Sequence, residues 1–513
     1  MKLSSLLLKG EYSSPYNPKD IEISEICYTG DRITPGCLFI CMRGTRYDSH
    51  LLLKTALQGN AAAVIVEEGA EYTAPKDFPI FSVPSTRRAL AYAYDRFYGS
   101  PAKDMRLIAV TGTNGKTSTA TMIYTILQAT GRRVAMIGTI ACKSEARDYK
   151  TEYVEEGRSA MTTPDPDILY SMLHKMQQDG VEYVVMEASS HALALEKLSP
   201  LQFEIGIFTN LSHEHLDFHA NMDSYLAAKA RLFSQCKYGI LNFDSEYAEQ
   251  IAKNATCRIL RCGAVYHEQY NAEDIKYRGA DGISYTLVSP SLRLPVSLPI
   301  PGSFTVYNSL LAITCAIQLG VTENEFPSAL RSVKGVPGRL EKVALDPQAA
   351  NFTVFIDYAH TEAALRNLLT TVRSFRRGSE RIVLLFGCGG DRDKSKRAPM
   401  GRVAEEYADY IIVTSDNSRT EEPTKIIHDI LQGMKNRSKR SVIVNRRRAI
   451  EHAIETAQEK DIILLVSKGH ETYELIDGKK LAFDEKEIVR EALAKRRRKK
   501  ENHENPIKPH LYS

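Results

Sequence analysis

The sequence predicts an α/β protein built from three domains. Its 513 residues exceed what one hydrophobic core usually supports, since domains hold about 100–200 residues each. Short apolar runs of strand length alternate with helical segments along most of the chain, which favours parallel sheets covered by helices. We place the domains at residues 1–100, 101–336 and 337–490, followed by a basic tail at residues 491–513.

Each domain is predicted from its own strands. The first contains apolar runs at residues 37–42 and 61–66, separated by polar turns, which indicates a small α/β domain. In the central domain, strands at residues 183–186 and 205–208 alternate with helices and indicate a mainly parallel sheet. The third domain is predicted to be Rossmann-like from strands at residues 353–356, 382–386, 410–413 and 462–466.

The composition is typical of a soluble globular protein, with 43% hydrophobic and 25% charged residues. The apolar run at residues 6–8 is too short for a signal core or a membrane span. Nine cysteines without a Cys-x-x-Cys pair indicate a reducing compartment. The basic run at residues 495–500 lacks interleaved aromatic residues, so we expect a solvated helix end and no nucleic-acid partner.

A phosphate-binding loop is predicted where the strand at residues 107–110 runs into a helix at residues 117–130. Gly112 and Gly115 let the backbone turn and bring its amides close to phosphate oxygens. Lys116 would reach the β and γ phosphates, and Thr117 would bind a magnesium ion. The loop departs from the common pattern, because Val110 occupies the position of its first glycine. A nucleoside triphosphate is therefore the first ligand to consider.

The ends of two further strands carry candidate metal ligands. Glu187 follows one strand, and His191, His213 and His215 lie close after this strand or the next. Because ligands bind beyond the carboxyl ends of parallel strands, a carboxylate and an imidazole there favour a magnesium site beside the triphosphate. Spacing alone does not choose among the three histidines. Lys229, on a helix predicted at residues 222–235, reads in isolation as a surface lysine.

Taken together, these segments resemble the Mur ligases, the ATP-dependent amide-bond-forming enzymes of peptidoglycan precursor synthesis. The likeness is greatest to the branch that makes the UDP-N-acetylmuramoyl-tripeptide, and it spans nearly the whole chain. The matching segments are residues 111–117, 162–164, 187–191, 215–217, 229, 336–339, 357–361, 386–394, 416–423 and 468–471.

The resemblance implies a metal site and an ATP site. Lys229 would carry a carbamate derived from CO2, which turns a cation into a carboxylate able to hold a second magnesium ion with His215 and Glu187. The catalytic residues would be Lys116, Lys229, His215 and Glu187, with Thr117 as a further metal ligand. The implied ATP contacts are Gly112, Thr113, Asn114, Gly115, Lys116, Thr117, Ser118, Asn308, Arg339, Asp357 and His360.

The same resemblance implies two substrate pockets. The UDP-linked substrate would bind Asp31, Thr162, Thr163, Ser189 and Lys197, and the amino acid would bind Arg392, Asp416, Asn417, Arg419, Ser467 and Glu471. In the branch that adds meso-diaminopimelate, an arginine clamps the distal carboxylate of the amino acid, and Arg419 matches it. The alternative for Arg419 is a surface ion pair with Glu421 or Glu422.

Five positions depart from the family pattern. Asp31 stands where a serine is usual near the uracil, and Lys197 replaces an arginine at the nucleotide sugar. Ser418 replaces a proline of the amino-acid pocket, Ser467 replaces a glycine, and Asn445 replaces an aspartate. These changes bear on substrate preference, because the phosphate loop and the implied metal ligands are intact.

Our main hypothesis is a monomeric, cytoplasmic ligase that joins meso-diaminopimelate to UDP-N-acetylmuramoyl-L-Ala-D-Glu. It would transfer the γ-phosphoryl group of ATP to the terminal carboxylate, and an amine would then attack the acyl phosphate. Alternatives are a divergent ligase for L-lysine, another amino acid or another acyl nucleotide, and a catalytically silent binding paralogue. Folylpolyglutamate synthetase shares the loop, but the segment at residues 35–39 argues against it.

Overall fold

The computed structural model describes residues 1–44, 47–73, 75, 77–149, 161–212, 214–215, 218–346, 349–378 and 380–504. The chain forms two compact units. The first comprises Met1–Asn271, Val288–Leu292 and Tyr307–Ser332, and the second comprises Ala272–Leu287, Arg293–Val306 and the chain from Val333 onward. No helix of the described residues is long and apolar enough to cross a membrane.

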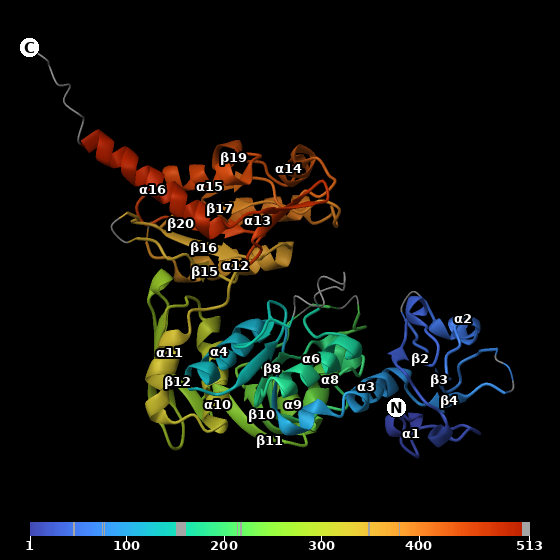
Figure 1. The fold of residues 1–513 in the computed structure, drawn as a ribbon. Helices are drawn as coiled ribbons and strands as arrows, with labels where there is room; N and C mark the ends of the chain where they lie inside the picture. Colours follow the sequence, from blue (N-terminus) through green and yellow to red (C-terminus); the bar gives the residue numbers. More distant parts are fainter. Residues whose placement is uncertain are drawn as a thin grey trace, which may run out of the picture. The chain divides into compact units, whose positions relative to one another are not determined.

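The first unit begins with a small parallel sheet (Figure 1). Its strands lie in chain order: β1 (Ile26–Cys27), β2 (Leu38–Ile40), β3 (Ala63–Glu67) and β4 (Ile80–Val83). Its helices are α1 (Leu3–Leu6), α2 (Leu53–Gln58) and α3 (Thr86–Phe97). Helix α3 starts after Ser85, whose hydroxyl accepts a hydrogen bond from the Arg88 amide and so caps the helix. The predicted small α/β fold at this end of the chain is confirmed.

A ten-stranded sheet follows, in the order β14-β13-β12-β11-β10-β9-β5-β8-β6-β7. Strand β5 (Arg106–Thr111) lies between β8 (Tyr183–Glu187) and β9 (Phe203–Phe208) and runs parallel to both. The remaining strands are β6 (Val134–Ile137), β7 (Cys142–Ser144), β10 (Cys236–Asn242), β11 (Arg258–Gly263), β12 (Tyr270–Tyr277), β13 (Ile283–Val288) and β14 (Arg293–Leu298). Pairing is parallel from β6 through β8, β5, β9 and β10 to β11, which confirms the mainly parallel core.

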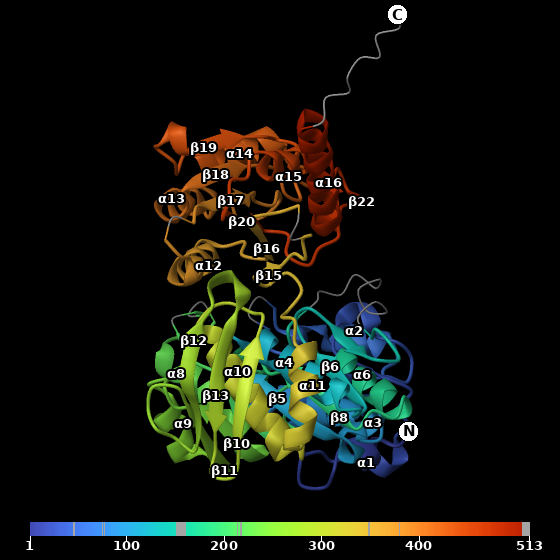
Figure 2. The ribbon, with the colours of Figure 1, turned by 90° about the vertical axis from the view of Figure 1, so that its left-hand side faces the viewer.

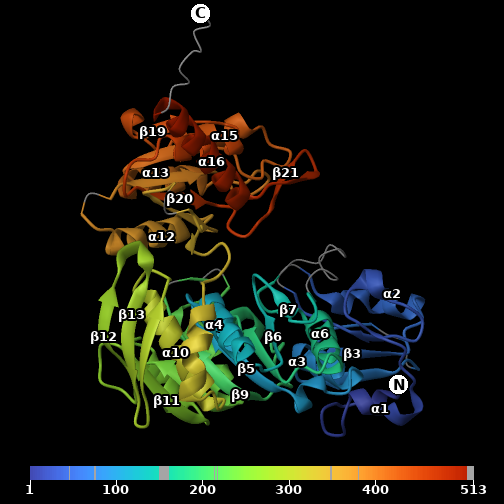
Figure 3. The same ribbon diagram turned by 60° about the vertical axis from the view of Figure 1, so that its left-hand side comes forward.

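The helices around this sheet are α4 (Lys116–Ala129), α6 (Pro166–Gln178), α7 (Ser190–Ala194), α8 (Met222–Ala230), α9 (Ala248–Asn254), α10 (Phe304–Gln318) and α11 (Phe326–Ser332). Figure 3 shows strand β5 leading into helix α4. Helix α4 lies within one residue of its predicted bounds. Helix α8 is shorter than predicted, because it gives way to a 3-10 turn at Arg231–Ser234.

The second unit contains a six-stranded sheet in the order β15-β16-β20-β17-β18-β19. Its strands are β15 (Glu341–Lys342), β16 (Thr353–Asp357), β17 (Ile382–Phe386), β18 (Tyr410–Val413), β19 (Arg440–Val442) and β20 (Ile462–Val466), with the hairpin β21 (Tyr473–Ile476) and β22 (Lys479–Ala482) beside them in sequence. All pairs in the six-stranded sheet are parallel except that of β15 with β16. The Rossmann-like prediction for this part of the chain is confirmed.

Helices cover both faces of this sheet (Figure 2). One apolar cluster joins the sheet to α12 (Glu362–Phe375), α13 (Arg397–Tyr407) and α14 (Pro423–Leu431), and a second joins it to α15 (Arg446–Glu455) and α16 (Glu485–Glu504). Helix α16 runs across residue 490, where the predicted basic tail begins, and buries Ala492 and Leu493 in the second cluster.

Candidate active site

The phosphate loop joins β5 to α4 in a conformation that requires its glycines. Gly112 has a φ of +145°, and a Cβ there would lie 1.9 Å from the Thr209 hydroxyl oxygen. Gly115 has a φ of +85°, and its Cβ would lie 2.4 Å from the side-chain oxygen of Asn308. Any larger residue at either position would have to displace these neighbours. The loop therefore has the tight path that brings backbone amides to an anion at the start of a helix.

Lys116 and Thr117 occupy the first turn of α4. The Lys116 ammonium donates hydrogen bonds to the carbonyl oxygens of Gly112 and Thr113, both at 2.9 Å, so the side chain folds back over the loop. Thr117 Oγ1 donates to Glu187 Oε2 at 2.9 Å. The structure thus brings the predicted phosphate-binding lysine, the hydroxyl and the carboxylate to one edge of the sheet.

Glu187 ends strand β8 and has no solvent exposure, which excludes a solvent-facing strand end. Its Oε1 accepts a hydrogen bond from the Thr139 amide at 2.9 Å, and its Oε2 accepts one from the Thr139 hydroxyl at 3.2 Å. A buried carboxylate is costly unless donors or a cation compensate it. Gly138 makes room for it, because a Cβ there would lie 2.3 Å from Glu187 Oε1.

Lys229 is also buried, with 1% exposure, so its interpretation in isolation as a surface lysine is wrong. Its Nζ donates to the Gly112 carbonyl at 2.8 Å and lies 4.5 Å from the centre of the Tyr225 ring. Burial, and secondarily the charge of Lys116, lowers the pKa of Lys229 to about 6. The amine is therefore mostly neutral at pH 7, unlike that of an exposed lysine.

His215 lies in a left-handed conformation with a φ of +58°, and its ring meets the edge of the His191 ring at 5.0 Å. His219 is buried in the same aromatic group, and its Nε2 lies 3.0 Å from the Ser190 hydroxyl. His213, Leu216 and Asp217 lie outside the described residues. Within the described part of the chain, no three His, Cys, Asp or Glu side chains form a cluster able to hold a metal ion.

The residues predicted for the UDP-linked substrate lie in two groups within the first unit. Thr163 Oγ1 donates to the main-chain carbonyl of Glu187 at 2.7 Å and accepts from the Ser189 amide at 3.0 Å, which ties it to the chain that follows β8. Thr162 reaches the same region, since its hydroxyl lies 3.0 Å from that of Thr139. Lys197 is buried and forms an ion pair with Asp165 at 2.8 Å.

Asp31 lies in the exposed 3-10 turn Gly30–Arg32, which follows β1. The turn is attached to the start of helix α6 through Asp167. Arg32 approaches this carboxylate to 3.6 Å, and the Tyr28 hydroxyl donates to it at 3.2 Å. Asp31 and Lys197 therefore both flank the first residues of α6, although they are far apart in sequence.

The predicted amino-acid residues of the second unit gather around a buried cation. Lys468 has no exposure, and its Nζ donates to Asn417 Oδ1 at 2.9 Å and to the Tyr473 carbonyl at 2.7 Å. It also lies 3.5 Å from Asp416 and 3.9 Å from Glu471. Asn417 completes the group by donating to Glu471 Oε2 at 2.7 Å. Burial raises the pKa of Glu471 above its usual value.

Arg419 does not form the surface ion pair considered as its alternative. Its Nη1 donates to the Gly390 carbonyl at 2.8 Å, whereas Glu421 is engaged by the buried Arg397 at 2.9 Å. The backbone of Arg419 is held by Leu475 and has a φ of +53°. Arg392 is exposed on the loop after β17.

Ser467 follows β20 with a φ of +97°, a conformation that favours glycine. Its hydroxyl donates to the Gly387 carbonyl at 2.7 Å, and its amide donates to the Asp357 carbonyl at 3.1 Å. The serine at a position that usually holds glycine therefore links the ends of three neighbouring strands. This bond offsets part of the strain of the unusual backbone.

The predicted ATP contacts of the second unit form a separate group. Asp357 accepts hydrogen bonds from the Leu340 amide at 2.7 Å and the Ala359 amide at 2.8 Å, and burial raises its pKa. The Arg339 guanidinium lies 5.5 Å from the centre of the Tyr358 ring. His360 lies three residues after Asp357, and burial lowers the pKa of His360.

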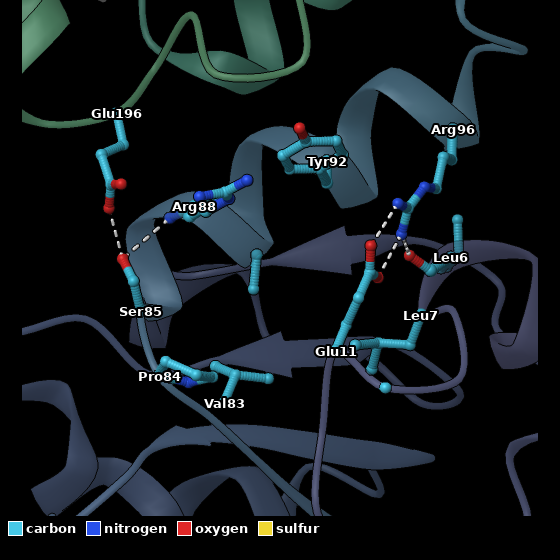
Figure 4. A pocket seen from close by; sticks show the side chains of 12 residues that line it. Leu6, Leu7, Glu11, Val83, Pro84, Ser85, Arg88, Tyr92, Arg96 and Glu196 are labelled. Carbon is cyan, nitrogen blue, oxygen red and sulfur yellow. Dashed lines mark hydrogen bonds and ion pairs between the residues drawn. The ribbon is translucent and has the colours of Figure 1, made fainter.

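A cavity of about 460 Å³ beside helix α3 contains none of the predicted site residues (Figure 4). Arg96 crosses one end and pairs with Glu11 at 2.7 Å. At the other end Glu196 accepts a hydrogen bond from the Ser85 hydroxyl at 2.5 Å. Glu196 is adjacent in sequence to Lys197, so the cavity wall and the predicted substrate lysine share one turn.

Sequence reasoning missed Thr139 and assigned no role to Lys468. Thr139 could have been found, because it follows strand β6 at the same edge of the sheet as Glu187. Lys468 lies inside a recognised segment, but its burial depends on the hairpin β21–β22, whose Tyr473 carbonyl it binds. No local pattern marks that contact.

The fold and these residues define a nucleotide-binding α/β protein with a phosphate loop at the carboxyl ends of a mainly parallel sheet. Residues 110–316 match the Mur ligase middle domain, and residues 338–469 match the Mur ligase glutamate ligase domain. The chain belongs to the Mur ligase family, whose members are ATP-dependent, ADP-forming amino-acid ligases.

Two relatives carry the name UDP-N-acetylmuramoyl-L-alanyl-D-glutamate--2,6-diaminopimelate ligase. The protein of Syntrophomonas wolfei is 39% identical over 96% of this chain and 99% of its own length. That of Clostridioides difficile is 39% identical over 96% of this chain and 100% of its own. A solved structure with the same name has a TM-score of 0.70 at 29% identity, and the match covers 97% of this chain and 99% of that one.

Proposed function

We propose that this enzyme adds meso-diaminopimelate to the D-Glu carboxylate of UDP-N-acetylmuramoyl-L-Ala-D-Glu, with ATP converted to ADP and phosphate. The observation that carries the proposal is the polar group in the second unit. There a guanidinium, an amide and a carboxylate lie close together, because Asn417 bonds both Arg419 and Glu471. The names of the relatives support the same reaction.

The phosphoryl step depends on the loop and its neighbours. Lys116 would leave the carbonyls of Gly112 and Thr113 and bind the β and γ phosphates, with the loop amides of residues 112–118 around them. Asn308 contributes to ATP binding through its place against Gly115. Arg339, Asp357 and His360 are assigned to ATP on family resemblance.

Magnesium suits the donors at the end of β8. Thr117 and Glu187 provide hard oxygen ligands 2.9 Å apart, and His215 would add an imidazole from the loop after β9. A carbamate on Lys229 would add the carboxylate that the described side chains otherwise lack. Bound magnesium would neutralise charge on the transferred phosphoryl oxygens and on the acceptor carboxylate.

The carbamate proposal is supported by the state of the Lys229 amine. Only a neutral amine attacks CO2, and burial lowers the pKa of Lys229 to about 6. The neutral amine would form a C–N bond with CO2 and lose a proton. The resulting anion would attract Lys116, which repels the charged form of the amine.

The substrates would be oriented by the two groups described above. Asp31, Thr162, Thr163, Ser189 and Lys197 would hold the UDP-linked dipeptide. In the second unit Arg419 would clamp the distal carboxylate of meso-diaminopimelate, with Arg392 as a second cation. Asp416, Asn417 and Glu471 would bind its distal ammonium group, and Ser467 would fix the backbone beside them.

We infer a cytoplasmic monomer that needs no nucleic-acid partner. Its co-substrate ATP and a nucleotide-linked substrate are cytoplasmic compounds, and its nine cysteines are free thiols. Sedimentation of the purified protein at several concentrations tests the monomer. A concentration-dependent shift to a dimer would contradict it.

The proposed reaction is tested by phosphate release from ATP with magnesium and UDP-N-acetylmuramoyl-L-Ala-D-Glu. Parallel reactions contain meso-diaminopimelate, L-lysine or L-ornithine, and mass spectrometry identifies each product. Turnover confined to meso-diaminopimelate supports the proposal. Preference for L-lysine or L-ornithine would keep the ligase and overturn the Arg419 clamp, whereas no turnover with any amine would favour a changed acyl substrate or a silent paralogue.

A further inference from the structure

Two buried thiols face each other at the base of an exposed loop. Cys27 ends strand β1 and Cys37 precedes β2, and both lie in the apolar cluster between the small sheet and α2. The Cys27 thiol donates a hydrogen bond to the Cys37 sulfur, with the two sulfur atoms 3.1 Å apart. The reaction proposed for the enzyme uses neither thiol.

We propose that Cys27 and Cys37 form a reversible disulfide when the protein meets a peroxide. The sulfurs need to approach by only about 1 Å to reach bonding distance, because a disulfide S–S bond is about 2.0 Å long. The segment between them, residues 28–36, is fully described and contains no buried residue. Opening this exposed loop admits a small oxidant without unfolding the sheet.

The two sulfurs differ in reactivity. The hydrogen bond from Cys27 lowers the pKa of Cys37 to about 7, although burial opposes this, whereas the pKa of Cys27 is raised. Cys37 is thus the thiolate that attacks, and Cys27 is the resolving thiol. Cys41, buried in the same cluster, has its pKa raised to about 12 by burial and serves as an unreactive comparison.

The steps balance with hydrogen peroxide as the oxidant. The Cys37 thiolate attacks one peroxide oxygen, the O–O bond breaks, and hydroxide leaves while Cys37 becomes a sulfenic acid. The Cys27 sulfur then attacks the sulfenic sulfur, the S–O bond breaks, and water leaves with the Cys27 proton. Two thiols are oxidised and one peroxide is reduced. A dithiol such as dithiothreitol reverses the reaction by thiol exchange.

The consequence rests on the proposed function, because Asp31 lies midway along the loop that the disulfide would close. Its turn is attached to α6 through Tyr28, which is adjacent to Cys27. Drawing the two ends of the loop together shifts this attachment. We therefore expect the oxidised protein to bind UDP-N-acetylmuramoyl-L-Ala-D-Glu about threefold or more weakly, with recovery on reduction.

The test treats the full-length protein with hydrogen peroxide, blocks the remaining thiols and digests without reduction. Trypsin cuts after Lys19, Arg32 and Arg43, so the disulfide joins the peptides of residues 20–32 and 33–43. Cys37 and Cys41 share the second peptide. The cross-link should therefore persist in Cys41→Ser and disappear in Cys37→Ser, with circular dichroism confirming that each variant folds.

Cys257 is an internal control, because it is half-buried, a hydrogen bond from Cys236 lowers its pKa, and it falls in a different tryptic peptide. Absence of the Cys27–Cys37 cross-link at peroxide concentrations that oxidise Cys257 would overturn the proposal. Calorimetry then compares binding of the UDP-linked dipeptide before oxidation, after oxidation and after reduction. A cross-link with unchanged affinity would refute the effect on substrate binding alone, and no binding in any state would count against the proposed function while the disulfide stands.

Discussion

The Nζ of Lys229 lies 2.8 Å from the carbonyl oxygen of Gly112, so a buried lysine touches the phosphate loop directly. The contact joins helix α8 to the loop between β5 and α4. It places the amine beside Lys116, and the two cations cannot both stay charged there at low cost. Neutralisation or modification of Lys229 relieves this repulsion.

The first prediction concerns the carbamate itself. Since the pKa of Lys229 is lowered to about 6, its amine is protonated and unreactive below pH 6 and free to add CO2 above it. In 13C-bicarbonate, a carbamate NMR signal should therefore grow as the pH rises through about 6. Lys229→Met should lack the signal, whereas Lys237→Met, which alters an exposed lysine, should keep it. Equal signals in both variants would assign the carbamate elsewhere.

Glu187→Gln should lower kcat by about a hundredfold or more, because it removes the negative charge at the proposed magnesium site. The amide remains almost the same size, so the fold should persist. Phosphate release measured across a magnesium titration checks this, and the apparent magnesium requirement should rise. Glu182→Gln is the matched control, because Glu182 is exposed and pairs with Arg133 at the surface. It should leave kcat and the magnesium requirement unchanged. An unchanged magnesium dependence in Glu187→Gln would contradict the assignment.

Arg419→Lys should reduce the discrimination between meso-diaminopimelate and L-lysine. The substitution keeps one positive charge but loses the two-pronged geometry that matches a carboxylate. We expect kcat/KM for meso-diaminopimelate to fall by about a hundredfold, while that for L-lysine changes little. Arg402→Lys, at an exposed position of α13, should have no effect. Equal losses with both amines would indicate that Arg419 only supports the loop.

Binding of the amino acid should depend on the ionisation of Glu471. Burial raises the pKa of Glu471, so its carboxylate is lost earlier than usual as the pH falls. The KM for meso-diaminopimelate should rise as the pH decreases through that raised pKa, because a neutral acid attracts the ammonium group less. In Glu471→Gln this part of the KM profile should be flat. A profile that keeps its shape in the variant would refute the role.

Lys468→Met should destabilise the protein by about 3–5 kcal/mol, because it leaves Asp416 and Glu471 without their buried cation. A fall in the melting temperature of the second unit measures the effect. Lys460→Met, at an exposed lysine, is the control and should melt like the parent protein. A melting temperature unchanged in Lys468→Met would show that solvent or the neighbouring amides compensate the carboxylates.

Much of the fold could be predicted because its strands are continuous apolar runs. Strands β17, β18 and β20 have the bounds predicted from the sequence, since buried parallel strands read as unbroken hydrophobic segments. Strands β12 to β14 were not predicted. Residues in β13 and β14 alternate between buried and more exposed positions. A search for continuous apolar runs does not find such strands, because polar residues interrupt them at every second position.

The site was less predictable, because burial depends on residues distant in sequence. Lys229 is buried where its Nζ reaches the carbonyl of Gly112, which lies 117 positions earlier in the chain. The partner of Arg419 is the Gly390 carbonyl and not Glu421, which pairs with the buried Arg397. Local sequence showed which groups were present but did not show how they are paired.

The packing of the six-stranded sheet depends on helix α16, which follows all six of these strands in the chain. Glu485 pairs with the buried Arg446 at 2.7 Å, and Ile488 and Val489 fill the apolar face of the sheet beside α15. During synthesis, until α16 is made, α15 alone covers this face of the sheet and Arg446 lacks its counter-charge. A chain that is released before residue 485 would leave part of this apolar face exposed, which favours aggregation.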